Sequence, residues 1–361
     1  MPDSYDRADS VNAVRVHQFT AAIGPRDAVS HHTFEVDTLL RDLGYESEIF
    51  AQHVHPDLRD RVRDYRLHAD LEADVVLYQA STGSPVADYV LTRTEPLIVN
   101  YHNLTPAEMF DPWEPHIGAE LDFGRRQLGR LARKASHGLA DSRFNATELE
   151  AAGLDDVVVA PVLFDPPRLR RSGTIDVGEP PTLLFVGRLS PNKCQEDLIA
   201  ATAALRRWMP EARLELVGAT SSHRYETALR DYAQRVCPGG VAFAGSVSDV
   251  QLADAYAHAD VFVCLSEHEG FCVPVIEAMA TGTPVVAFAA AVLPETIGTA
   301  GVLLDNKSPT NVAVALQRVL TDRELRAQLV ENGRRRAATF SPERNRSVMR
   351  EALRRVVEDC V

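Results

Sequence analysis

Short apolar runs alternate with helical patterns along this chain, and the alternation restricts the folds open to it. In the first half, the runs that predict strands are residues 14–19, 47–51, 75–78, 97–101, 138–140 and 157–162. Helical patterns lie between several of these runs, with one ending near Gly44 and others at 123–135 and 146–152. Strands that alternate with helices are typical of parallel βαβ units. The first half is therefore predicted to be an α/β domain with a parallel sheet.

A segment rich in proline and glycine interrupts this pattern. The segment Asp165 to Pro181 contains four prolines and two glycines, which is typical of a linker. The alternation then restarts, with strands predicted at 183–186, 213–217, 241–244, 261–265 and 284–288 and helices at 195–208, 225–236 and 250–259. Helical patterns at 309–320, 323–338 and 342–361 close the chain. We expect a first domain at 1–165, a linker at 166–181, a second domain at 182–341 and a final helix at 342–361.

Composition excludes several classes of protein. A net charge of −13 argues against nucleic acid as a partner, because phosphate binding needs a dominant basic surface. The five cysteines are Cys194, Cys237, Cys264, Cys272 and Cys360, and they form no C-x-x-C pair. This spacing argues against a disulfide framework and favours a reducing cytoplasm. The N-terminus is polar and acidic, unlike a signal peptide, and no apolar run approaches the ~18 residues that span a bilayer.

The segment from Leu265 to Phe288 places two carboxylates, Glu269 and Glu277, on either side of a predicted helix start. Pro274 suits the first turn of that helix, since its missing N–H has no partner there. The free amides of such a turn favour an anionic phosphate, and a carboxylate can accept hydrogen bonds from a sugar diol. The alternative is that Glu277 only offsets the helix dipole and Glu269 is a solvated loop acid.

Two cations follow the first predicted strand of the second half, in the sequence VGRLSPNK. Arg188 and Lys193 flank a turn at Ser190 to Asn192. Arginine can hold a diphosphate through its planar fork, and lysine can hold it as a point charge. The alternative is a solvated turn with two surface cations.

Together these segments resemble the family-4 retaining glycosyltransferases of GT-B architecture. The resemblance rests on G-R-L-x(3)-K at Gly187 to Lys193 and E-G-F-x(5)-E-A-M-A-x-G-x-P-V-V at Glu269 to Val286. It covers essentially the whole second half. It implies an α/β fold of two Rossmann-like domains that face each other across a cleft, and a final helix that crosses back to the first domain.

The resemblance also implies roles for residues at matching positions. Arg188 and Lys193 would hold the donor diphosphate, with Gly187 beside them, and Lys193 is expected to face solvent. Glu277 would bind the nucleotide ribose and Glu269 the donor hexose, oriented by the backbone amides of Gly270, Phe271, Cys272 and Val273. Cys272 departs from the family, where glycine is commoner. Its side chain would alter donor choice or would simply be a small buried hydrophobe.

In the first half the resemblance is looser. Asp27 lies in the loop that would close over the donor phosphates, but the usual double glycine is absent and Asp27 could cap the following helix instead. His102 would lie close to the transferred sugar; the alternative is a satisfied histidine packed in the cleft. Ser142 and Asn145 match a further family position that faces the cleft.

Several chemistries find no motif in the sequence. There is no D-x-D, no H-E-x-x-H and no G-x-G-x-x-G, so we expect no catalytic metal, no cofactor and no dinucleotide oxidoreductase. The leaving diphosphate would be neutralised by Arg188, Lys193 and helix amides. The helix at 123–135 carries five basic residues. One interpretation is a peripheral membrane contact, and the other is an ordinary helix packed on the sheet.

The predicted function is metal-independent transfer of a hexosyl group, with retention, from a UDP- or GDP-sugar to a hydroxyl acceptor of unknown identity. The donor would bind the second domain and the acceptor the first. Two alternatives remain open. One is another nucleotide-sugar enzyme, such as an epimerase. The other is a degenerate member of the fold that binds sugar or serves as a scaffold.

Overall fold

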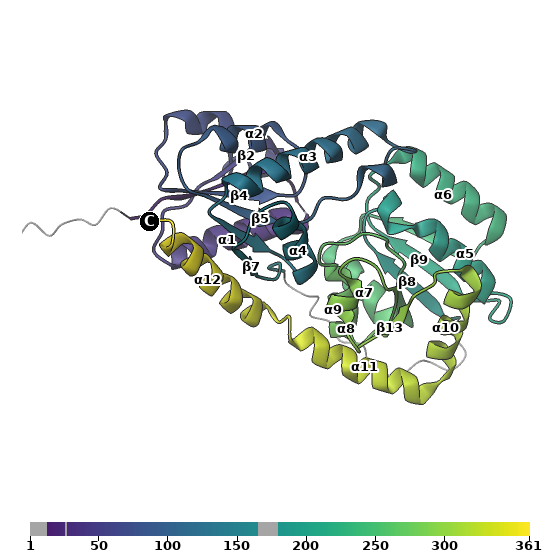
Figure 1. Cartoon of the computed structure of the whole chain (residues 1–361). Helices are drawn as coiled ribbons and strands as arrows, with labels where there is room; N and C mark the ends of the chain where they lie inside the picture. The colour runs from purple at the N-terminus through teal and green to yellow at the C-terminus, as the bar shows by residue number, and fades with distance from the viewer. Residues whose placement is uncertain (1–12, 26, 165–179) are drawn as a thin grey trace, which may run out of the picture.

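The computed structural model describes residues 13–25, 27–164 and 180–361. Two parallel α/β sheets, one of seven strands and one of six, form two Rossmann-like domains (Figure 1). The predicted fold class is therefore confirmed. The predicted linker at 166–181 lies outside the described residues except for Pro180 and Pro181.

The N-terminal sheet has the strand order β3-β2-β1-β4-β5-β6-β7, and all its pairs are parallel. Its strands are β1 Val16–Ile23, β2 Ile49–Val54, β3 Arg63–Asp64, β4 Val75–Ala80, β5 Leu97–Tyr101, β6 His137–Ala140 and β7 Val157–Val159. Its helices are α1 Ala28–Asp42, α2 Pro85–Thr92, α3 Pro115–Lys134 and α4 Arg143–Ala151, with 3₁₀ turns at η1 Pro56–Leu58, η2 Tyr65–Asp70 and η3 Ala107–Met109. Every residue of the central strands β4 and β5 is buried, as expected when helices cover both faces of a parallel sheet.

The C-terminal sheet has the strand order β10-β9-β8-β11-β12-β13. Its strands are β8 Thr182–Val186, β9 Arg213–Val217, β10 Val241–Gly245, β11 Val261–Cys264, β12 Val285–Phe288 and β13 Val302–Leu304. Its helices are α5 Gln195–Leu205, α6 His223–Val236, α7 Asp249–His258, α8 Val273–Thr281, α9 Leu293–Ile297, α10 Pro309–Thr321 and α11 Arg323–Ala338, with the turn η4 Pro191–Lys193.

The direction in which strands are added reverses once in each sheet. The reversal lies between β1 and β4 in the first domain and between β8 and β11 in the second. Ligands of open α/β sheets bind at such switch points, beyond the carboxyl ends of the strands. The loops after these four strands are therefore expected to form a ligand-binding site.

The final helix, α12 Pro342–Glu358, leaves the second domain and lies along the first (Figure 1). Met349 and Leu353 are fully buried in one cluster with Val36 of α1. Arg346 pairs with Glu35 at the edge of this contact. The last helix therefore belongs to the core of the N-terminal domain.

Helix α3 starts at Pro115, eight residues before its predicted start at Phe123. It buries Leu121, Leu128 and Leu131 in the N-terminal core. Its cations bond to groups of the same chain: Arg130 pairs with Asp88 at 2.8 Å, and Lys134 donates to the Arg93 carbonyl. These contacts support the ordinary packed helix over the membrane-contact interpretation. Among the described residues, no helix combines the length and the apolar character that crossing a membrane requires.

Candidate functional site

A cleft of about 1330 Å³ opens between the two domains. The N-terminal domain contributes the loops after β1, β2, β4, β5 and β6, and the C-terminal domain contributes the loops after β8 and β11. The predicted residues that line it are Asp27, His102, Arg188, Lys193, Glu269, Gly270, Phe271, Cys272 and Val273. Gly187, Ser142 and Glu277 are not among the described residues that line it.

Lys193 and Glu269 lie together although 76 positions separate them in sequence. Strands β8 and β11 are neighbours in the sheet, so the loops that follow them meet at one edge. Asn192 connects the two loops through two hydrogen bonds. Its side-chain amide donates to the His268 backbone carbonyl at 3.0 Å, and its backbone carbonyl accepts from the Glu267 backbone amide at 3.0 Å.

The Lys193 ammonium forms an ion pair with the Glu269 carboxylate. Only 17% of the lysine side chain and 11% of the glutamate side chain are exposed. The expectation that Lys193 faces solvent is therefore wrong, because the neighbouring loop covers it and supplies its counter-ion. Arg188, in contrast, is exposed at the wall of the cleft.

Gly187 precedes Arg188 at the end of β8 and lies in tight contact with β9. Its φ is +155°, and its carbonyl would lie 2.1 Å from a Cβ added to Gly218. Gly218 itself has a φ of +144°, which a residue with a side chain rarely adopts. The glycine pair allows the two backbones to approach where Arg188 turns into the cleft. Gly187 therefore shapes the turn and does not line the cleft.

Helix α8 begins at the floor of the cleft. Cys272 is its N-cap residue with φ 65° and ψ 62°, a left-handed conformation that favours glycine. Val273 opens the helix, and Pro274 lies in its first turn as predicted. The Phe271 ring packs on Phe164 and Phe340, so that side chain belongs to the core. The free amides at this helix start favour an anion in the cleft.

Gly270 lies in close contact with the N-terminal domain. A Cβ added there would lie 2.7 Å from Cβ of Asn103, so no side chain fits without a shift. The Ser142 hydroxyl donates to the Gly270 carbonyl at 2.9 Å and accepts from the Asn145 amide as the N-cap of α4. Ser142 therefore joins the domains beside the cleft, and its hydroxyl does not face into it.

Glu277 lies one turn into α8, behind the residues that line the cleft. The Tyr256 hydroxyl donates to its Oε2 at 2.7 Å. Burial raises the pKa of Glu277 to about 7, and the tyrosine hydrogen bond only partly opposes that rise. The carboxylate is therefore close to half-protonated near neutral pH.

Asp27 is the N-cap residue of helix α1, so the helix-capping role predicted as its alternative is present. Its Oδ2 accepts from both the amide and the hydroxyl of Ser30, each at 2.8 Å. Because Asp27 also lines the cleft, contact with a donor remains a prediction for it. The cap places this carboxylate beside the helix start that would face the donor phosphates.

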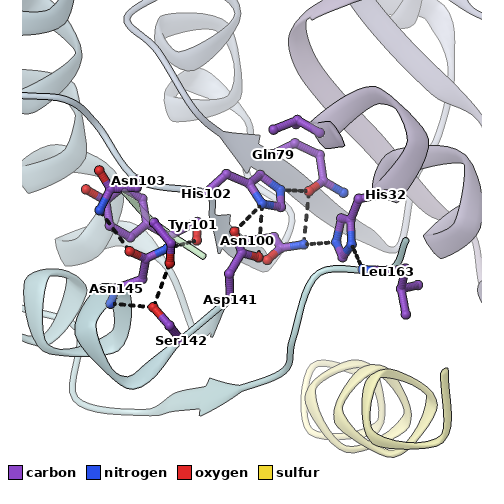
Figure 2. A network of polar contacts seen from close by, with 12 residues as sticks. His32, Gln79, Asn100, Tyr101, His102, Asn103, Asp141, Ser142, Asn145 and Leu163 are labelled. Carbon is purple, nitrogen blue, oxygen red and sulfur yellow. Dashed lines mark hydrogen bonds and ion pairs between the residues drawn. The ribbon is translucent and has the colours of Figure 1, made fainter. Parts of the chain in front are cut away.

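The His102 side chain lies between Asp141 and Gln79 within the N-terminal domain (Figure 2). Its Nδ1 lies 2.9 Å from Asp141 Oδ2, its Nε2 lies 2.7 Å from Gln79 Oε1, and only 1% of the side chain is exposed. This burial favours the alternative, a satisfied histidine, while contact of His102 with the transferred sugar stays a prediction. Its backbone lines the cleft while its ring anchors the loop after β5.

This anchor extends through a buried chain of polar side chains to the backbone of Leu163, which follows strand β7 (Figure 2). The Asn100 amide lies 3.0 Å from Gln79 Oε1 and 2.8 Å from His32 Nε2. The Leu163 amide donates to His32 Nδ1 at 3.0 Å, and burial lowers the pKa of His32 well below its usual range. His32 is thus neutral, and the network connects the His102 loop with the chain that leaves the first domain.

We expect Asp141→Ala to lower the free energy of unfolding by about 1–3 kcal/mol, because it leaves the buried His102 Nδ1–H without an acceptor. Asp141→Asn keeps an oxygen at that position and should lose clearly less. Urea unfolding of both variants measures the difference. Equal losses for the two variants would contradict the anchoring role of Asp141.

Sequence reasoning missed two residues at this site. His268 stands between Glu267 and Glu269 in the sequence and lines the cleft. Burial lowers its pKa to about 4, so it is neutral at physiological pH. Glu295 of α9 crosses to the other domain, where its carboxylate accepts from the amides of Arg143 at 2.8 Å and Phe144 at 3.0 Å. The position of His268 next to Glu269 in the sequence could have identified it as a cleft residue. No local pattern predicts the contact that Glu295 makes, since this contact depends on how the two domains meet.

Comparisons with known proteins agree with this arrangement. Residues 169–336 match the family model of glycosyl transferases group 1. A D-inositol 3-phosphate glycosyltransferase of Kineococcus radiotolerans is 31% identical over 264 residues, which cover 66% of this chain and 60% of that protein. The chain spans about half the length of the curated relatives it matches.

Solved structures show the same fold over nearly the whole chain. Sucrose-phosphate synthase from Thermosynechococcus elongatus superposes with a TM-score of 0.77 at 19% identity, covering 96% of this chain and 100% of that one. Anabaena HepE in complex with UDP-glucose superposes with a TM-score of 0.71 at 20% identity, covering 94% and 99%. Residues 169–336 of this chain are thus similar in sequence to the group 1 glycosyltransferases, and the chain has the GT-B fold of these solved structures.

Proposed function

We propose that this protein transfers a hexosyl group from a nucleotide-diphosphate sugar to a hydroxyl acceptor, with retention of configuration and without a catalytic metal. The observation that carries the proposal is the meeting of Arg188, Lys193 and Glu269 at the switch point of the C-terminal sheet. This arrangement suits a ligand with a diphosphate at one end and hydroxyl groups at the other.

In this proposal the diphosphate lies between the start of α8 and the two cations. Arg188 is exposed to the cleft and free to fold its fork over the phosphate oxygens. Lys193 contributes a positive charge next to them, in a site where burial strengthens electrostatic interactions. As the bond to the sugar breaks, these groups and the α8 amides stabilise the negative charge that develops on the leaving nucleotide.

The ion pair with Glu269 positions both partners. Lys193 restricts the Glu269 carboxylate to one side of the cleft, where its remaining acceptor capacity would face the hexose hydroxyls. The proton of the acceptor hydroxyl would pass to an oxygen of the donor phosphate on the same face of the sugar. No separate protein base is then required, which is consistent with a His102 ring held within the N-terminal domain.

The acceptor would occupy the N-terminal wall of the cleft. Polar side chains there include His53, Arg59, Thr82 and Glu120, and Thr82 donates to Glu120 at 2.8 Å. The hydrogen bonds from Ser142 to Gly270 and from Arg143 to Glu295 hold the two domains together beside the cleft. We propose a polyhydroxylated acceptor because both walls offer hydrogen-bonding groups.

The experiment that tests this function incubates the protein with UDP- and GDP-hexoses, with and without a panel of sugar and polyol acceptors, in the presence or absence of EDTA. We expect nucleotide release that requires an acceptor and persists in EDTA. An epimerase would change the sugar without releasing nucleotide, and a binding protein or scaffold would do neither. Turnover abolished by EDTA would exclude the metal-independent mechanism.

A further inference from the structure

Two buried cysteines and a carboxylate converge at the C-terminal side of the cleft. Cys264 ends strand β11, Glu269 lies in the loop that follows, and Cys272 caps α8. Their two sulfur atoms and a carboxylate oxygen all lie within 4.8 Å of one another. Among the described residues, this is the one group of three histidine, cysteine or acidic side chains gathered so closely.

We propose that Cys264, Glu269 and Cys272 form a binding site for a single thiophilic divalent cation, such as Zn²⁺, whose occupancy inhibits the donor site. Two thiolates and one carboxylate are ligands that zinc accepts, and three protein ligands leave its fourth position for water. Soft sulfur ligands select such ions over Mg²⁺ or Ca²⁺.

The charges at this site match those of a divalent cation. The Cys272 sulfur lies within 4.8 Å of the Cys264 sulfur. Cys264 Sγ also lies 3.3 Å from the Ser266 hydroxyl. Two thiolates and the Glu269 carboxylate, set against Lys193, would carry a net charge of −2, which one divalent cation neutralises.

Inhibition follows from the position of the site. Glu269 and Cys272 line the cleft, whereas Cys264 does not. A cation bound to the Glu269 carboxylate competes with Lys193 for it and withdraws it from the donor hexose. This consequence rests on the proposed transferase function, whereas binding of the ion itself does not.

The test titrates the full chain, kept reduced, with Cd²⁺ and records the thiolate-to-cadmium charge-transfer absorption in the ultraviolet. We expect one Cd²⁺ per chain, displaced by Zn²⁺ and unaffected by Mg²⁺. Cys264→Ala should abolish the absorption and weaken binding by at least about 100-fold, since even the loss of a residue that supports a ligand weakens metal binding about 10–100-fold. Cys237→Ala is the matched control, because Cys237 is also buried in this domain but belongs to another part of the core.

Cys264→Ser provides a second variant in case the smaller alanine impairs folding. Wild-type binding that survives both Cys264 variants unchanged would overturn the proposal, as would equal loss in Cys237→Ala. Bound cadmium should also raise the unfolding temperature of the wild type but not of either Cys264 variant. Zn²⁺ should inhibit nucleotide release by the wild type and spare Cys264→Ala. If cadmium binds as expected while no donor is turned over, the metal site stands and the transferase function fails.

Discussion

Lys193→Ala should reduce turnover by about 10²–10³-fold, the usual effect of removing one group that stabilises developing charge in a transition state. The loss of turnover follows from two roles of the Lys193 ammonium group. The Lys193 ammonium would neutralise the departing diphosphate, and it also holds the Glu269 carboxylate in place. Initial rates of nucleotide release at saturating donor measure the effect, because the charge develops in the chemical step.

Lys134→Ala is the matched control for this variant. Lys134 is partly buried as well, but it ends α3 in the other domain and donates to the Arg93 carbonyl, away from the cleft. Its removal should leave the rate within about twofold of the wild type. Lys193→Arg, which keeps the charge, should recover part of the lost rate. A rate for Lys193→Ala close to that of Lys134→Ala would remove the assigned role of Lys193, provided circular dichroism shows both variants folded.

Glu277→Ala should weaken binding of the nucleotide sugar about 10–100-fold at pH 8, if the ionised carboxylate accepts hydrogen bonds from the ribose. Calorimetry of donor binding measures the change. Glu277→Gln is the more informative companion, since it keeps the size of the side chain and the contact with Tyr256 while removing the charge. Unchanged donor affinity in both variants would rule out the ribose contact.

The pH dependence of donor binding gives this prediction a second signature. Burial raises the pKa of Glu277 to about 7, so the carboxylate is largely ionised at pH 8 and largely protonated at pH 6. Wild-type affinity should therefore rise with pH through about 7, and the rise should be smaller in Glu277→Gln. The intact nucleotide sugar is the right ligand, because its diphosphate has no terminal group that titrates in this range.

The same raised pKa affects stability in the opposite direction. The folded state holds a proton on Glu277 between the usual pKa of a glutamate and about 7, so the resulting stabilisation is complete at low pH and lost as pH rises through about 7. Unfolding of the free protein at pH 6 and pH 8 should show this difference in the wild type and less of it in Glu277→Gln. Affinity and stability thus change with opposite sign in one pH window.

The sequence predicts the strands and helices that are determined by local patterns of apolar residues. Apolar runs such as 97–101 and 261–265 coincide with β5 and β11 to within one residue, because a strand covered on both faces reads as a nearly continuous apolar run. The short helices α2 and α9 were not predicted, since eight and five residues do not complete enough turns to show a helical period. The edge strand β13, with three residues, gives a similarly weak signal.

Contacts between distant segments could not be read from the sequence in the same way. The spacing motifs identify Arg188, Lys193 and Glu269 as candidates, but the burial of Lys193 depends on β8 and β11 being neighbours. The direction of the His102 ring depends on Gln79 and Asp141, which come from two other strand ends. The meeting of Cys264 with Cys272 likewise needs the left-handed turn before α8, which the departure from glycine at that position obscures.

The most direct test of the central claim follows the anomeric proton of the transferred sugar by NMR while the wild-type protein reacts with an α-linked UDP- or GDP-hexose and an acceptor from the panel. A retaining transferase gives a new α-anomeric signal that grows in proportion to the nucleotide diphosphate released. A β-linked product would contradict retention, and release of free hexose or epimerised donor without a glycoside would contradict transfer.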